Sequence, residues 1–277
     1  MAIAVKESES ESLSGLEYGG RYQSESRIDV GTIFGTMIGV GLIVWAIIRG
    51  GNPETFLNLN AVLIVFGGTI ATSFIAYPSG KILSLIRVII NAYRPDNQGP
   101  AAYIEQIMQL ATKYRTGGIK RLKNEEENVE NRFLRAGIGM IVDGYNSREI
   151  HEILDREMNS MIERHQRSQK ILQFMAVQAP IFGMGGTLIG LVQMLMHIEN
   201  PDTIGPSLAT ALITTFYGIM LANLIITPVV AKLSHRTESE TLLCRIIRVG
   251  ILGIHDRTNP QKIRRNMNAL LSPEQQR

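Results

Sequence analysis

The residues in this sequence best suited to chemistry are hydroxyl side chains inside two long apolar runs. Thr187 lies in the third apolar run of the chain, and Thr214, Thr215 and Tyr217 lie in the fourth. Hydroxyl oxygens are neutral lone-pair donors that can replace part of the water around a small cation, but they cannot balance its charge. The third and fourth runs are far more polar than the first two, so we expect them to line an internal surface; if that surface conducts ions, the threonines would supply neutral oxygens around them.

A carboxylate is missing from these same runs. Proton and cation carriers within membranes usually depend on Asp, Glu or His, and residues 171–196 and 207–231 contain none of them. Each run instead contains a proline, Pro180 or Pro228, which frees a backbone carbonyl and kinks its helix. We therefore expect the coordinating or titrating acid to come from another chain, so the sequence predicts a hetero-complex.

Four apolar runs must position these side chains. They cover residues 30–48, 61–79, 171–196 and 207–231, and none contains Asp, Glu, Lys or Arg. Because a bilayer core about 30 Å thick needs about 20 helical residues to cross, each run is predicted to be a transmembrane helix. The predicted fold class is all-α, a polytopic membrane protein with four transmembrane helices and a helical cytoplasmic domain.

The basic residues predict the orientation of the four helices. The short connections at 49–60 and 197–206 contain Arg49 and no other Lys or Arg, whereas the remaining segments outside the runs hold 3, 15 and 9 of the chain's 28. Basic residues stay in the cytoplasm. We expect an inner-membrane protein with both termini and the long middle segment in the cytoplasm.

This topology divides the chain into five segments. They are a disordered, Ser- and Glu-rich tail at 1–28, helices one and two at 29–80, a cytoplasmic helical domain at 81–170, the ion-path helices three and four at 171–231, and a cytoplasmic C-terminal helix and tail at 232–277.

The middle segment at 81–170 contains apolar residues at helical spacing. Apolar residues in 101–114 recur on one helical stripe, and Gly117 with Gly118 interrupts the pattern. A second amphipathic stretch runs from about Ser147 to Gln169 and leads directly into the third run. We expect one continuous helix from the cytosol into the membrane.

Several stretches of this sequence resemble the MotA/PomA subunits of flagellar stators, over roughly residues 29–260. They are DVGTIFGTMIGV, LIVFGGT, AVQAPIFGMGGTLIGLVQML and GPSLATALITTFYGIMLANLIITPVVAKL. The resemblance implies a ring, taken to be a homo-pentamer, around two single-span MotB/PomB chains whose helix carries the essential Asp. Ion passage between partner and ring then turns the ring, which drives the flagellar rotor through the protein FliG.

The same resemblance assigns roles to individual residues. Pro180 and Pro228 match the family's two functional prolines, Thr187 and Thr215 match threonines that line the ion path in sodium-type members, and Arg115 matches a basic residue used on the rotor. Because Thr187 and Thr215 match threonines of sodium-type members, the coupling ion is expected to be sodium slightly more than protons. A Na⁺ ion would then bind transiently near both hydroxyls. No resident metal or cofactor is expected.

Two positions depart from the family pattern. Lys123 stands where the family often has Glu, with Glu125, Glu126 and Glu127 just beyond it, so the rotor contact is expected to shift along this segment. Asn58 stands where PomA-like chains often have Asp before the second helix, which weakens the sodium assignment.

Three other functions remain open from the sequence: an ExbB/TolQ-type energiser of envelope transport, a self-sufficient ion channel or transporter, and a passive membrane scaffold. The usual three-span count of ExbB/TolQ chains argues against the first, and the lack of any intramembrane charge argues against the second. An enzyme is not expected, because the single cysteine, Cys244, and the five histidines form no nucleophile–base or metal-ligand pattern. The small net charge of +3 does not indicate nucleic-acid binding.

Overall fold

The computed structural model describes residues 30–51, 53–93, 99–199 and 201–271, and within these residues every regular element is a helix. The predicted tail at 1–28 lies outside the described residues. The apolar half of the molecule holds α2 (Val30–Arg49), the short turn η1 (Pro53–Phe56), and α3 (Leu59–Val62), η2 (Leu63–Gly67) and α4 (Gly68–Ala76), which together form the second span.

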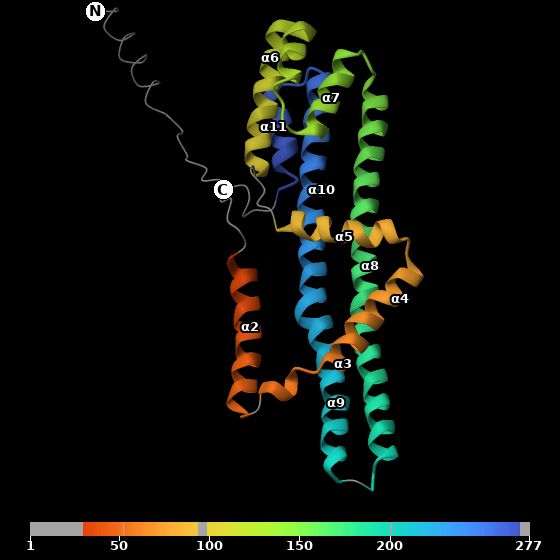
Figure 1. Cartoon of the computed structure of the whole chain (residues 1–277). Coiled ribbons are helices and arrows are strands. Elements are labelled where there is room, and N and C mark those ends of the chain that lie inside the picture. Colours follow the sequence, from red (N-terminus) through yellow and green to blue (C-terminus); the bar gives the residue numbers. More distant parts are fainter. Residues whose placement is uncertain (1–29, 52, 94–98, 200, 272–277) are drawn as a thin grey trace, which may run out of the picture.

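Two long helical columns join the two halves of the molecule (Figure 1). The first is α8 (Ser147–Met196), and the second is formed by α9 (Pro201–Met220), η3 (Leu221–Ile226) and α10 (Thr227–His255). The charged half gathers α6 (Pro100–Glu126), α7 (Arg132–Val142) and α11 (Pro260–Asn268) around one end of these columns. Between the halves, α5 (Ser79–Ala92) lies across α8 and α10.

The predicted all-α membrane fold is confirmed. Three helices are long and apolar enough to cross a membrane, Pro53–Ala76, Ser147–Met196 and Ile204–His255, and α2 supplies a shorter apolar segment, Met37–Arg49. The helix expected to continue from Ser147 into the third span is present as the 50 residues of α8. It starts with a capping box, in which the Asn146 side chain accepts from the Glu149 backbone and the Glu149 side chain accepts from the Asn146 backbone.

Helix boundaries in the second and fourth spans differ from the predicted ones. The second span ends at Ala76 rather than at residue 79, because Tyr77 is extended before Pro78 and the chain then turns into α5. The fourth helix begins at Pro201, inside the predicted outer connection, because a proline is well tolerated in the first turn of a helix.

The interior of the charged half is a closed apolar core. The predicted stripe on α6 is buried, with Ile107 at 0% exposure, and it packs with fully buried side chains of α7, α8 and α10 such as Leu134, Ile150 and Ile247. The interruption expected at Gly117 and Gly118 is present, since Gly118 has φ +65° within α6. Helix α7 was not predicted, although Asn131 caps it by accepting from the Leu134 backbone at 3.0 Å.

The apolar half has a smaller buried cluster and many exposed apolar side chains. Val65, Ala179, Leu221 and Ala222 form part of its interior. Helix α2 lies at the edge of the apolar half (Figure 1), where a Cβ on its Gly39 would lie 3.4 Å from Leu224 of η3, and its described side chains are mostly exposed. An apolar exterior of this kind is typical of helices that face lipid or other subunits.

Candidate functional site

The helices α8 and α9 approach each other closely because glycines line their contact. A Cβ built on Gly186 would lie 2.6 Å from the side chain of Thr214, and one on Gly190 would lie 2.8 Å from the Cβ of Ala211. From the other side, a Cβ on Gly218 would lie 2.6 Å from the carbonyl oxygen of Ala179. The small residues therefore allow the backbones themselves to touch, as in other membrane helix pairs.

Thr187 and Thr215 meet across this glycine-lined contact, and their hydroxyl oxygens lie 2.5 Å apart. The Thr187 hydroxyl also lies 3.1 Å from the Gly183 carbonyl oxygen and 3.3 Å from that of Ala211, and the Thr215 hydroxyl lies 3.3 Å from the Gly183 oxygen. Four neutral oxygens thus converge at one half-buried place, which we call the hydroxyl cluster. They can share the coordination of a small cation through lone pairs, but they offer no negative charge.

Thr214 lies beside the hydroxyl cluster and is fully buried. Its hydroxyl donates to the Ala211 carbonyl at 2.8 Å, so its proton is used within its own helix. Thr214 packs against Gly186 and serves the helix contact more directly than it serves the cluster.

The two prolines lie at different kinds of place. Pro180 is inside α8 where α9 crosses it, since a Cβ on Gly218 would lie 3.1 Å from the Pro180 Cα. Pro228 lies in the first turn of α10, directly after the π-helical turn η3. The Thr227 hydroxyl donates to the Ala222 carbonyl at 2.8 Å, which satisfies one backbone oxygen in this irregular turn.

Tyr217 points away from the hydroxyl cluster. Its hydroxyl donates to the carbonyl oxygen of Phe56 in η1, and the rings of Phe56 and Phe216 pack edge to face at 5.8 Å. Nearby, the Asn58 side chain donates to the Thr210 hydroxyl at 2.9 Å and accepts from the Ala61 backbone. These contacts attach the start of the second span to α9. From the sequence, Asn58 was noted only as a departure from the family pattern, and its contact with Thr210 was not predicted.

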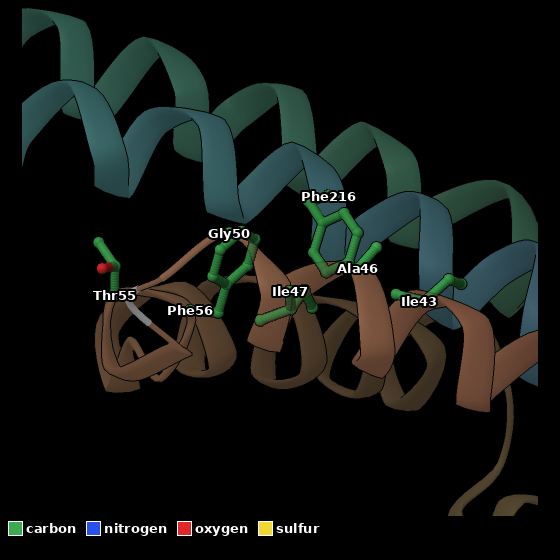
Figure 2. Close-up of a pocket in the computed structure, with 7 residues that line it drawn as sticks. All are labelled: Ile43, Ala46, Ile47, Gly50, Thr55, Phe56 and Phe216. Carbon is green, nitrogen blue, oxygen red and sulfur yellow. The ribbon is translucent and has the colours of Figure 1, made fainter.

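A groove of about 510 Å³ opens between α2, η1 and α9 (Figure 2). Its lining residues are Ile43, Ala46, Ile47, Gly50, Thr55, Phe56 and Phe216. In Figure 2 the Phe56 and Phe216 rings lie beside α2. The lining is uncharged and offers one side-chain hydroxyl, so the groove suits apolar packing and not ion coordination.

The residues predicted to contact the rotor lie at the far end of the charged half. Arg115 is exposed, three residues before the kink at Gly118, and Lys123 is exposed in the short helical segment after it. Glu125 turns back to form an ion pair with Lys113 at 2.8 Å, and Glu126 is half-buried beside Gly139 of α7. The kink therefore leaves the two cations outside and directs these two carboxylates toward the protein.

The fold and site together define a helical membrane protein whose last two spans meet at neutral oxygens. The model of the MotA/TolQ/ExbB proton channel family matches residues 125–246. The chemotaxis protein PomA of Vibrio alginolyticus is 34% identical over 236 residues, which cover 85% of this chain and 92% of that protein. Motility protein A of Treponema phagedenis is 30% identical over 250 residues, covering 90% and 96%.

A solved structure agrees with these relatives. The flagellar MotAB stator complex from Bacillus subtilis superposes with a TM-score of 0.81 at 26% identity, covering 88% of this chain and 96% of that one. The chain therefore belongs to the MotA/TolQ/ExbB proton channel family, among its MotA/PomA flagellar stator subunits. The resemblance predicted from the sequence is confirmed.

Proposed function

We propose that this chain is the ring subunit of a stator that couples cation flow across the inner membrane to rotation of the flagellum. One observation carries the mechanism: the hydroxyl cluster of Thr187 and Thr215 lies in two spans that contain no acidic residue. Neutral oxygens alone bind a cation weakly, so a ligand of negative charge must be brought to them.

A second chain would supply that charge. The similar Bacillus subtilis protein was solved in a MotAB complex, and a single-span MotB/PomB-like partner with an intramembrane Asp is the corresponding companion here. We propose a homo-pentameric ring around this companion. The exposed apolar side chains of α8, such as Val177, Met184 and Leu188, offer a face for such contacts.

The charged half would face the cytoplasm. This orientation is supported by the distribution of Lys and Arg, since the two short connections contain Arg49 alone. In this orientation the exposed Arg115 and Lys123 face the rotor protein FliG. Exposed ion pairs contribute only about 0–1 kcal/mol each, so contacts of this kind can exchange as two surfaces move past each other.

In this mechanism, ion transfer would change how favourably the partner Asp contacts the hydroxyl cluster. A cation moving between the partner Asp and the hydroxyl cluster changes the charge of that Asp, and with it the Asp's preference for neutral oxygens over water. One charge crossing 100 mV releases about 2.3 kcal/mol, which is enough to bias one step of the ring. Sodium is slightly favoured over protons, because hydroxyl and carbonyl oxygens are suitable ligands for a hard cation.

Ion flux in liposomes tests the proposal. The chain reconstituted with its companion should conduct cations, and the same complex with the companion's Asp changed to Asn should not. Flux through this chain alone would instead support a self-sufficient channel. Swimming speed with and without sodium at fixed pH then separates sodium from proton coupling.

A further inference from the structure

Helix α5, which crosses the two helical columns between the halves (Figure 1), has apolar side chains on two of its sides. On one side, Leu85 is buried in the apolar cluster with side chains of α8 and α10. On another side, Leu83, Ile86 and Ile90 are 63%, 63% and 55% exposed. Their spacing of three and four residues places them on one stripe of the helix. The described part of the chain therefore leaves a second apolar face of α5 uncovered.

A polar cavity beside α5 shows in which direction this exposed stripe faces. Val88 of α5 lines the cavity, whose volume is about 390 Å³, together with His165 of α8 and Arg236 of α10. His165 and Arg236 both lie beyond the uncharged runs of their columns, so the cavity is on the side of α5 toward the charged half. Ile86 and Ile90 each stand two residues from Val88, which places them about 200° around the helix from it. The exposed stripe therefore faces the apolar half and the bilayer.

Arg87 lies between the bilayer-facing and cavity-facing sides of α5. It stands two residues after the buried Leu85, so it points about 200° away from the columns. It also stands one residue from both Ile86 and Val88, about 100° from each. Arg87 is exposed and forms no ion pair with any described residue. Because long basic side chains keep their charged ends at the membrane surface, this guanidinium is placed at the level of the lipid phosphates.

The charges at this boundary favour a lipid with a negative headgroup. Helix α5 contains Lys81 and Arg87 and has no Asp or Glu in its sequence. On the side of the charged half, the first charged residue beyond the second, third and fourth spans is in each case a lysine, namely Lys81, Lys170 and Lys232. Basic residues next to a leaflet attract anionic lipids, whereas a zwitterionic headgroup brings its own ammonium group close to the same cations. An anionic phospholipid is therefore the better ligand for this surface.

We propose that α5 binds an anionic phospholipid of the cytoplasmic leaflet, with an acyl chain along Leu83, Ile86 and Ile90 and the phosphate at Arg87. A planar guanidinium can donate two parallel hydrogen bonds to two phosphate oxygens, which gives the contact a defined geometry. The choice of the cytoplasmic leaflet rests on the orientation proposed above. The lipid contact itself follows from the faces of α5 and needs no assumption about torque.

The bound lipid would be connected to the ion-path helices through α10. Arg236 of α10 donates to the Asn91 carbonyl in the last turn of α5. Leu85 of α5 and Leu233 of α10 belong to the same apolar cluster. A lipid held by α5 therefore fixes the depth of this column in the bilayer.

Quenching of tryptophan fluorescence by brominated lipids tests the site. Trp45 is the only tryptophan in the sequence, so Ile86→Trp in a Trp45→Phe background reports on α5 alone. The full-length chain is reconstituted in phosphatidylcholine vesicles that contain increasing fractions of brominated phosphatidylglycerol or brominated phosphatidylcholine. The anionic lipid should quench with an apparent affinity about fivefold higher than that of the zwitterionic lipid. If Ile86→Trp does not fold, Ile90→Trp on the same exposed stripe replaces it as the reporter.

Two arginine variants of the reporter chain complete the test. Arg87→Gln should lose most of the preference for phosphatidylglycerol, whereas Arg132→Gln, which removes an exposed arginine from α7, should keep it. Equal quenching by the two lipids, or a preference that persists in Arg87→Gln, would overturn the anionic site. Quenching by neither lipid would also overturn it and would indicate that a second copy of the chain covers the stripe. The vesicles carry the brominated lipid in both leaflets and need no flagellum, so a failed lipid site and a failed stator assignment give different results.

Discussion

The two halves of this molecule are held together in different ways. The charged half has a continuous core in which large side chains such as Ile107, Leu134 and Ile251 are completely buried. In the apolar half, large side chains such as Leu188 and Val192 are exposed, and glycines bring the backbones of α8 and α9 into direct contact. The hydrophobic effect drives the packing of the charged half, whereas close contact between helix backbones holds the apolar half together.

This difference shows which half buries its apolar surface without lipid or other subunits. The charged half buries its apolar surface within one chain, so it can keep its shape while it moves. The apolar half leaves much of its apolar surface outside, and its oxygens at Thr187 and Thr215 lack a negative partner in the described spans. It is therefore the part whose structure and chemistry depend on lipid and on other subunits.

The largest expected effect comes from a cavity in the charged half. Leu134→Ala should destabilise this half by about 2–5 kcal/mol, because Leu134 is fully buried among α6, α7 and α10. Leu188→Ala is the control in the apolar half, where the side chain is 65% exposed, and it should change the stability of the isolated chain little. Equal losses in the two variants would remove the contrast between the halves.

The single cysteine provides the measurement. Burial raises the pKa of the Cys244 thiol to about 12, with the neighbouring carboxylates of Glu240 and Glu157 adding to the shift. Since the thiolate is the reactive form, labelling near pH 8 requires the core of the charged half to open. Labelling should be slow in the wild type and in Leu188→Ala and much faster in Leu134→Ala.

A methyl group between α8 and α9 should have the next largest effect. Gly218→Ala places a Cβ 2.6 Å from the Ala179 carbonyl and 3.1 Å from the Pro180 Cα, where only backbone movement gives room. The expected cost is about 1–3 kcal/mol in thermal unfolding. Gly185→Ala is the control, because its Cβ would meet no heavy atom within 4 Å.

The same variant also tests whether the halves unfold separately. If the glycine contact belongs to the apolar half alone, Gly218→Ala should lower the Tm of that half and leave Cys244 labelling near the wild-type rate. Labelling that accelerates as much as it does in Leu134→Ala would mean that the two halves unfold as one unit.

The sequence predicted best those features that depend on residues close together within one helix. The unbroken α8, the kink at Gly118 and the buried stripe of α6 follow from local pattern, because helical spacing and glycine conformation act within a few residues. Helix α7 carried the same kind of signal, in the Asn131 cap and the apolar side chains from Phe133 to Ile141, and could have been predicted.

Contacts between distant segments could not be derived in this way. Tyr217 was predicted to lie on the ion path with Thr215. A step of two residues along a helix rotates the side-chain direction by about 200°, so Tyr217 instead points toward η1. The pairing of Thr187 with Thr215 came from a family resemblance. Its distance, and the nearby Gly183 and Ala211 carbonyls, depend on how closely the glycines let α8 and α9 approach. The inward turn of Glu125 likewise depends on the position of Lys113 after the kink.

Loss of one hydroxyl from the cluster should affect function more than stability. Thr187→Val keeps the shape and removes contacts with Thr215 and the Gly183 carbonyl, at a cost of about 0.5–1.5 kcal/mol. We expect ion flux and swimming speed to fall, with a greater dependence on sodium concentration if sodium is the coupling ion. Thr72→Val is the control, since its hydroxyl bonds only carbonyls of its own helix. Normal flux in Thr187→Val would exclude the cluster from the ion path.

The smallest effect on stability should come from a charge reversal at the outer surface of the charged half. Arg115→Glu changes an exposed side chain, so the free energy of unfolding should stay within about 0.5 kcal/mol of the wild type. If Arg115 contacts the rotor, swimming should nevertheless fall while assembly and ion flux persist. Arg132→Glu, at an exposed position in the first turn of α7, controls for net charge and should swim normally. Equal motility in the two variants would place the rotor contact elsewhere on the charged half, with the exposed Lys123 the next residue to reverse, because it lies on the other side of the Gly118 kink.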